Sequence, residues 1–246
     1  MVETGGDRGV VVLIHGLWFR ASVWSPWLPE LDEAGYDAVV VSWRDSEQLR
    51  AARGHARAQP RPPIVIGHGT GALVAERLLI AGDAAAAISL APVPGGYPAI
   101  AAASRLTRRG TGLALLGVRG GTVVPTFRQF RRMMANAGSD ADARDRYERH
   151  IAAAAPRNVL LHAARRRLPA CDGPPRRGPL LLAAGGRDEL IGEMSTAARY
   201  RGYRRHQPAA VTDYKVFPGL DHTLGLGNQD MSVLYYCLDW LTAQNM

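Results

Sequence analysis

The chain has 246 residues and a formal net charge of +8, with 47% hydrophobic and 21% charged residues, an ordinary balance for a globular protein. No apolar run approaches the roughly 20 residues of a membrane-spanning helix, and the polar first residues do not resemble a signal peptide, so we expect a cytoplasmic protein without membrane association. Its two cysteines, Cys171 and Cys237, lack metal-ligand neighbours, which predicts neither a disulfide nor a metal site.

Strands and helices alternate along the first part of the chain. Short apolar runs rich in β-branched residues predict buried strands at 9–14, 37–41, 63–66 and 86–91. Apolar residues at helical spacing predict helices at 22–34, 46–57 and 72–80. This alternation is typical of right-handed βαβ units that build a parallel sheet.

Residues 93–178 interrupt the alternation. They contain 16 arginines against 5 acidic residues, a surplus of 11 positive charges. Helix-favouring stretches occur at 98–107, 125–135, 140–154 and 158–167. We expect a helical lid over the carboxyl edge of the sheet, where ligands bind in such folds.

The charge of this segment has two readings. It indicates either a solvated surface or a face that attracts an anionic substrate or an acidic carrier protein. Nucleic-acid binding is not expected, because the arginines are not interleaved with aromatic residues.

The alternation resumes after the basic segment. Strands are predicted at 179–184 and 213–217, and helices at 193–205 and 229–243. The sequence therefore predicts an α/β fold with a mostly parallel sheet of about six strands flanked by helices. Residues 1–92 and 179–246 form its core, and the lid of residues 93–178 is inserted after the fourth strand.

Three strands end in loops whose residues suit acyl transfer, in the order nucleophile, acid and histidine. These loops read Gly67-His68-Gly69-Thr70-Gly71, Gly185-Gly186-Arg187-Asp188 and Pro218-Gly219-Leu220-Asp221-His222, and the pair His15-Gly16 follows the first strand. In this order and at these places, the motifs resemble the α/β-hydrolase family over residues 10–241. The similarity is strongest to lidded, actinobacterial-type serine hydrolases.

The resemblance places a nucleophile in the turn at residues 67–71. The family pattern G-x-S-x-G puts a serine in a strained strand-to-helix turn, with glycines on either side because the turn has no room for side chains. Gly67 and Gly71 fit this pattern. The nucleophile position is Gly69, which has no atom that can attack a carbonyl, so an acyl-enzyme through residue 69 is excluded.

The resemblance also assigns a base and an acid. His222 stands where the family keeps its general base, and Asp188 would orient the imidazole and stabilise its charged form. Glu189 and Asp221 are alternative carboxylates that fit the family pattern less well.

An oxyanion hole of backbone N–H groups does not depend on a serine. By resemblance its donors are Thr70 and either Leu17 or Trp18, and the dipole of the helix that begins at Thr70 adds to it. We expect the Thr70 hydroxyl to lean into its own helix.

Four side chains are candidates for substrate binding. Trp18, Phe19 and Phe127 are apolar residues that either line a pocket or fill the lid core. His68 lies beside the nucleophile position, where a turn-stabilising role is the alternative.

Three functions fit these residues. The first is an enzyme of secondary metabolism that uses His222 and Asp188 for acid–base chemistry on a carbonyl-containing small molecule, by elimination, cyclisation or water-mediated hydrolysis. The second is an esterase-like or lipase-like serine hydrolase whose nucleophile at position 69 was replaced. The third is a non-catalytic binder of a small molecule or carrier protein, which the retention of both Asp188 and His222 disfavours. No cofactor is expected, since the run 67–71 lacks the Lys-Ser/Thr ending of a phosphate loop.

Overall fold

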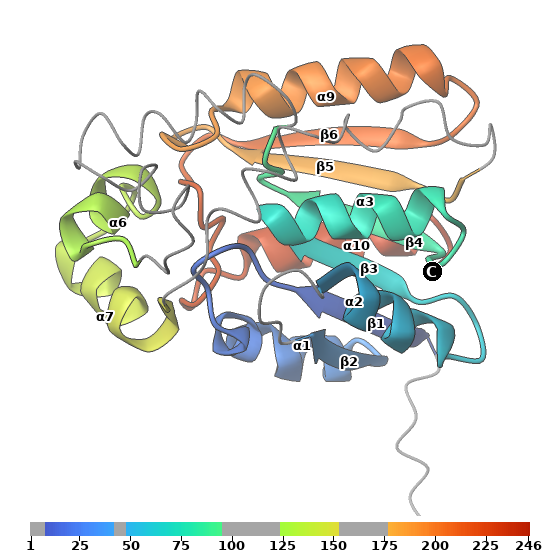
Figure 1. Cartoon of the computed structure of the whole chain (residues 1–246), viewed down its shortest axis with the longest axis horizontal. Coiled ribbons are helices and arrows are strands. Elements are labelled where there is room, and N and C mark those ends of the chain that lie inside the picture. The colour runs from blue at the N-terminus through green and yellow to red at the C-terminus, as the bar shows by residue number, and fades with distance from the viewer. Residues whose placement is uncertain (1–7, 42–47, 95–123, 153–176) are drawn as a thin grey trace, which may run out of the picture.

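The computed structural model describes residues 8–41, 48–94, 124–152 and 177–246. Within them a six-stranded parallel sheet lies between two layers of helices (Figure 1). The strands are β1 (Gly9–Ile14), β2 (Tyr36–Val41), β3 (Ile64–His68), β4 (Ala86–Leu90), β5 (Leu180–Gly185) and β6 (Thr212–Phe217). The predicted fold class is therefore confirmed.

The strand order places a topological switch point at the carboxyl ends of β1 and β3. Along the sheet the order is β2-β1-β3-β4-β5-β6, so the chain moves outward from β1 to β2 and then continues on the other side of β1. The loops that follow β1 and β3 consequently leave in different directions. Ligands bind at such switch points, beyond the carboxyl ends of the strands.

Alternating side chains bury both faces of the sheet. Leu13 and Ile66 belong to the apolar cluster on one face, and Val12 and Val65 belong to the cluster on the other. The first face packs against η1 (Ala21–Trp27), α1 (Leu28–Glu33) and α10 (Ser232–Ala243). The second face is covered by α2 (Gln48–Arg57), α3 (Thr70–Ile80) and α9 (Glu193–His206). In Figure 1, α3 lies in front of the sheet and α10 behind it.

The predicted helix at 22–34 is divided. Residues Ala21–Trp27 form a 3₁₀ helix, and a short α-helix begins at Leu28. Pro26 lies inside the first piece and Pro29 in the first turn of the second. Since proline has no N–H for the α-helical hydrogen bond, two prolines at this spacing interrupt one continuous helix while allowing a new one to start.

Two helices of the predicted lid are described, α6 (Phe127–Met133) and α7 (Asp140–His150). They lie beyond the carboxyl ends of the strands, at the left of Figure 1. The end of α7 is tied to the loop after β1, because Arg20 N donates to His150 O at 2.8 Å and Ala152 N donates to Trp18 O at 2.7 Å. The predicted helices at 98–107 and 158–167 lie outside the described residues, so the lid boundaries of 93–178 stay a prediction.

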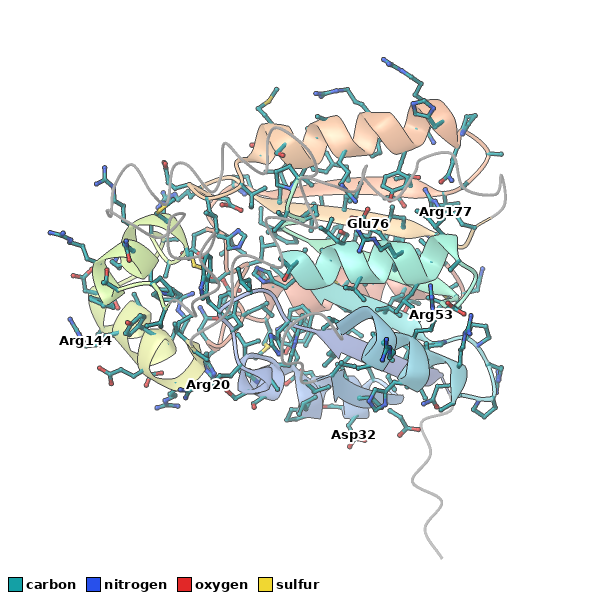
Figure 2. All side chains as sticks on the ribbon, viewed as in Figure 1. Arg20, Asp32, Arg53, Glu76, Arg144 and Arg177 are labelled. Carbon is teal, nitrogen blue, oxygen red and sulfur yellow. The ribbon has the colours of Figure 1, made fainter. Side chains whose placement is uncertain are left out.

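A buried ion pair joins α3 to α9. Both carboxylate oxygens of Glu76 accept hydrogen bonds from Arg199, and the Tyr203 and Ser89 hydroxyls each donate to the same carboxylate at 2.6 Å. Figure 2 labels Glu76 between the two helices. We call these four residues the Glu76 cluster.

The helices in the described ranges are all too short or too polar to span a bilayer.

Candidate functional site

Three alternating glycines mark the passage from β3 to α3: Gly67 lies near the end of β3, Gly69 between the two elements and Gly71 in the first turn of α3. A Cβ added at Gly67 would lie 2.2 Å from Gly71 O, and one added at Gly71 would lie 2.2 Å from Ile14 O. Both positions therefore exclude any side chain, in agreement with the steric reason for glycine there. Gly69 between them has φ +56° and ψ −111°, a conformation that L-residues rarely adopt.

Position 69 differs from Gly67 and Gly71 because an added Cβ there would meet no atom closer than ordinary contact distance. A Cβ built on Gly69 would lie 3.6 Å from Gly16 Cα and 3.9 Å from His222 Nε2. Both distances are ordinary van der Waals contacts, so a small side chain fits. The turn thus directs residue 69 at the imidazole of His222.

His222 and Asp188 form a buried pair. His222 Nδ1 lies 2.8 Å from Asp188 Oδ2, and the two side chains are 4% and 3% exposed. Because a carboxylate oxygen only accepts, Nδ1 carries the proton of the neutral imidazole. Nε2 is then the unprotonated nitrogen, on the side that faces Gly69.

The Asp188 carboxylate is held in its charged form. Its second oxygen, Oδ1, accepts from Leu190 N and Ile191 N, both at 2.8 Å. Burial alone raises the pKa of this carboxyl, but the charge and hydrogen bond of His222 and the two backbone amides outweigh it, so that the pKa lies below its ordinary value of 3.8. Asp188 is therefore an anion at neutral pH.

The expectation for the Thr70 hydroxyl was wrong. Instead of leaning into α3, Thr70 Oγ1 accepts from Leu17 N at 3.0 Å. Thr70 is the first residue of its helix, so no helical turn precedes it whose carbonyl could accept the hydroxyl proton. One of the predicted oxyanion donors is thus already hydrogen-bonded to the side chain of another predicted donor.

The other predicted oxyanion donor, Trp18, lies in a strained segment. Its φ of +69° is in the left-handed region, which is unusual for a bulky residue. Its carbonyl accepts from Ala152 N of the lid, and its side chain is buried.

The candidate substrate-binding side chains occupy three different environments. Phe19 is buried and packs edge-on against the His68 ring, with centroids 5.2 Å apart. His68 is fully buried beside His222. Phe127 lies in the lid, where its ring contacts Tyr147 at 5.6 Å and the Arg144 guanidinium at 4.0 Å.

Neither alternative carboxylate takes the place of Asp188 beside the imidazole of His222. Glu189 is exposed. Asp221 accepts from the backbone N–H and hydroxyl of Thr223 at 3.0 and 2.6 Å, and from Ala137 N at 2.9 Å. Asp221 therefore holds the loop of His222 against the lid.

A second contact between the lid and this loop was not predicted from the sequence. Arg146 of α7 is 4% exposed and donates to Thr223 Oγ1 at 2.6 Å. Nothing in the local pattern indicated its burial, because an arginine among the charged residues of α7 has the sequence environment of a solvated residue.

Part of the positive charge of the lid is neutralised within the lid itself. Arg131 pairs with Asp140 at 2.6 Å, and Arg149 pairs with Asp145 at 2.7 Å. The larger share of the basic excess lies outside the described residues. Over the ranges that are described, no group of three or more His, Cys, Asp or Glu side chains is arranged to hold a metal ion.

Comparison with known proteins agrees with this geometry. Residues 11–232 match the family model described as "Alpha/beta hydrolase family". No curated protein matches the sequence.

Several solved structures share the fold. A monoacylglycerol lipase from Paleococcus ferrophilus superimposes with a TM-score of 0.68 at 16% identity, over 97% of this chain and 95% of that chain. Polyneuridine aldehyde esterase gives a TM-score of 0.67 at 11% identity, over 96% and 100% of the two chains. A methylesterase from Arabidopsis gives 0.66 at 17% identity, over 95% and 98%. At identities this low, the superpositions establish a shared fold and nothing about shared activity.

Proposed function

Because the chain belongs to the alpha/beta hydrolase family, we propose that it is an enzyme that performs acid–base chemistry on a carbonyl-containing small molecule, without a covalent intermediate at residue 69. One observation carries the proposal. The Nε2 atom of His222 faces the backbone of Gly69 across the space of a side chain, while Asp188 holds the other nitrogen.

The simplest reaction for this arrangement is removal of a proton next to the carbonyl. The proton passes from the substrate carbon to His222 Nε2, and the electron pair of the broken C–H bond moves onto the carbonyl oxygen as an enolate. Asp188 stabilises the imidazolium that results. In elimination, the enolate expels a leaving group from the β-carbon, and His222 gives its proton to that group. In ring closure, the enolate carbon bonds to a second carbonyl carbon of the same molecule, and His222 gives its proton to the oxygen of that carbonyl.

Donors for the enolate oxygen lie in the same turn. The backbone N–H of Thr70 begins α3, where the helix dipole favours negative charge. The Thr70 hydroxyl, which accepts from Leu17 N, retains its own proton for a second hydrogen bond. A hydroxyl and an amide from one residue would thus share the role that two amides have in the family pattern.

Water-mediated hydrolysis uses the same residues. A water molecule over Gly69 would donate to His222 Nε2 and attack an ester carbonyl directly, with its proton passing to the imidazole. The ester C–O bond of the resulting tetrahedral intermediate then breaks, and the imidazolium gives the proton to the departing alcohol oxygen. This reaction also needs no side chain at residue 69. An anionic substrate or an acidic carrier protein at the basic lid is compatible with either reaction.

A second candidate, a serine hydrolase whose nucleophile was replaced, is favoured by the contacts of position 69. A Cβ there meets only ordinary distances, and a serine hydroxyl one bond further would reach His222 Nε2. The lipase and esterase folds among the similar structures agree with this candidate.

The test is proton exchange in deuterated water. A panel of ketones, esters and thioesters is incubated with the protein, and loss of the α-proton signals is followed by NMR. We expect accelerated exchange for at least one compound, no acceleration with His222→Ala, and no increase with Gly69→Ser. A fluorophosphonate, which labels activated serines, should leave the wild-type chain unlabelled.

The opposite pattern would select the second candidate. If Gly69→Ser produces rapid cleavage of 4-nitrophenyl butyrate and fluorophosphonate labelling, while the wild-type chain exchanges no α-protons, the acid–base proposal is wrong. A matched control is Gly54→Ser, a substitution in α2 where an added Cβ meets nothing within 4 Å.

A further inference from the structure

The imidazole of His68 is enclosed directly behind that of His222. His68 is fully buried, and its ring meets the ring of His222 edge-on with centroids 4.9 Å apart. On its other sides lie Phe19 and Gly16, where an added Cβ would come within 2.8 Å of His68 Nδ1. The glycine of the His-Gly pair after β1 therefore leaves the room that the His68 ring occupies.

The hydrogen bond of His68 fixes its tautomer. Nε2 lies 2.8 Å from the backbone carbonyl oxygen of His222. Because a carbonyl oxygen only accepts, Nε2 carries the proton and donates it. Nδ1 is then unprotonated, and it has no hydrogen-bond partner among the described residues.

The two bonds to His222 act on different parts of the residue. Asp188 holds the side chain through Nδ1, whereas His68 holds the backbone through the carbonyl. A side chain's position is fixed only when both its torsion angles and its backbone are fixed. Asp221 and Arg146 hold the neighbouring Thr223, whereas His68 bonds the carbonyl of His222 itself.

We propose that His68 is a positioning residue, which anchors the backbone of His222 so that the Nε2 atom of His222 stays directed at Gly69. This inference rests on the proposed function, in which that nitrogen is the base. It assigns to His68 a role through His222 and no contact with the substrate.

The protonation state of His68 suits this role. Burial, and next the proximity of His222, lower the pKa of His68 from 6.5 to about 3. The residue therefore stays neutral at physiological pH. A charged imidazole in its place would oppose the positive charge that His222 acquires when it takes a proton.

The experiment uses NMR of the imidazole nitrogens and needs no substrate. In the wild-type chain we expect His68 to be protonated at Nε2 and unprotonated at Nδ1 from about pH 5 to about pH 8. We also expect a strongly downfield Nδ1–H proton for His222, which reports its bond to Asp188. The rate at which this proton exchanges with water measures how firmly His222 is held.

Two variants separate anchoring from packing. His68→Leu fills the space but cannot donate, so exchange of the His222 Nδ1–H should accelerate by about tenfold or more. His68→Gln places an amide N–H near the former Nε2 and should recover most of the protection. His55→Gln, a substitution of an exposed histidine in α2, should leave the rate unchanged.

Specific results would overturn the inference. They are a wild-type His68 protonated at Nδ1, an unchanged exchange rate in His68→Leu, or equal acceleration in the leucine and glutamine variants. If His68→Leu does not fold, the inference is still tested by the tautomer of wild-type His68 and by the exchange rate of the His222 Nδ1–H in His68→Gln. If the NMR results contradict the role of His68, the proposed function is still tested separately by α-proton exchange. If the chain shows no α-proton exchange, the NMR results on His68 remain valid.

Discussion

The Glu76 cluster and the pair formed by His222 and Asp188 are both buried, yet they use their polar atoms differently. In the Glu76 cluster both carboxylate oxygens accept from an arginine, and two hydroxyl groups complete the shell. In the pair, the carboxylate is equally well satisfied, but His222 Nε2 has no hydrogen-bond partner within the described part of the chain.

This difference indicates that the Glu76 cluster contributes to stability, whereas the pair formed by His222 and Asp188 has an atom available for chemistry. A buried carboxylate whose two oxygens both accept hydrogen bonds fixes the relative placement of the elements it joins. In the function that we propose, a buried pair with one open nitrogen instead keeps a base available beside the switch point of the sheet. Substitutions in the two clusters should therefore affect different measurements.

The largest effect is expected on activity, from Asp188→Asn. The carboxamide NH₂ would donate to His222 Nδ1 and force the imidazole proton onto Nε2, where the base is needed. We expect α-proton exchange to slow by about 10⁴-fold, with a much smaller change in the free energy of unfolding. Equal exchange rates for the variant and the wild-type chain would contradict the role of this pair.

The largest effect on stability is expected in the Glu76 cluster. Arg199→Met leaves Glu76 charged and buried without its cation, which should lower the free energy of unfolding by about 3–5 kcal/mol. The double variant Glu76→Met/Arg199→Met should be more stable than Arg199→Met alone. Urea denaturation measures both.

An exposed ion pair provides the control for that comparison. Arg149 and Asp145 lie four residues apart on α7 with side chains 70% and 48% exposed. Arg149→Met should change the free energy of unfolding by no more than about 0.5 kcal/mol. A loss as large as that of Arg199→Met would mean that burial does not distinguish the two pairs.

A smaller effect is expected on the pH dependence of stability. Unfolded His68 takes up a proton as the pH falls through about 6.5, whereas the folded residue stays neutral down to about 3. Its contribution to stability is therefore complete above pH 6.5 and is lost as the pH falls toward 3, by at most about 1.4 kcal/mol per pH unit.

His68→Gln tests this linkage, because glutamine does not titrate. The free energy of unfolding should decline less steeply between pH 6.5 and 4 in the variant than in the wild-type chain. His15 and His150, whose pKa values are also lowered mainly by burial, act in the same direction and remain in both proteins. Parallel curves would show that His68 does not titrate in this way.

A modest effect on stability, larger than that of the exposed control Arg149→Met, is expected from Thr70→Val. The variant leaves Leu17 N–H without the hydroxyl that accepts it, which should cost about 1–2 kcal/mol in unfolding free energy and accelerate hydrogen exchange of the Leu17 amide. Thr70→Ser, which keeps the hydroxyl, should stay close to the wild-type chain. An unchanged Leu17 amide in the valine variant would show that the hydroxyl bond is not protective.

The sequence predicts those parts of the molecule that depend on local pattern. Strands buried on both faces appear as short apolar runs, and the glycines of the turn reveal a place without room for side chains. The same patterns, placed at strand ends, put His222 and Asp188 in loops at one edge of the sheet.

Contacts between side chains far apart in the chain could not be predicted from the sequence. Glu76 and Arg199 meet across 123 positions, and each alone has the appearance of an ordinary polar residue of a helix. An acid among the apolar residues of α3 was the one available hint, since charged residues are rarely buried without a partner. The Thr70 hydroxyl was misjudged and the Arg146 contact was missed for the same reason, because their partners come from other segments.

The backbone conformation of Gly69, together with the room for a small side chain there, has an evolutionary consequence. With φ at +56°, glycine is relaxed where serine is strained by about 1 kcal/mol or more, so a chain that no longer needs the hydroxyl becomes more stable by losing it. Glycine and serine codons can differ by a single nucleotide, and the neighbouring glycines stay fixed by sterics. If the proposed function holds, one mutational step separates nucleophilic from acid–base catalysis on this scaffold, and the glycines at 67 and 71 need not change.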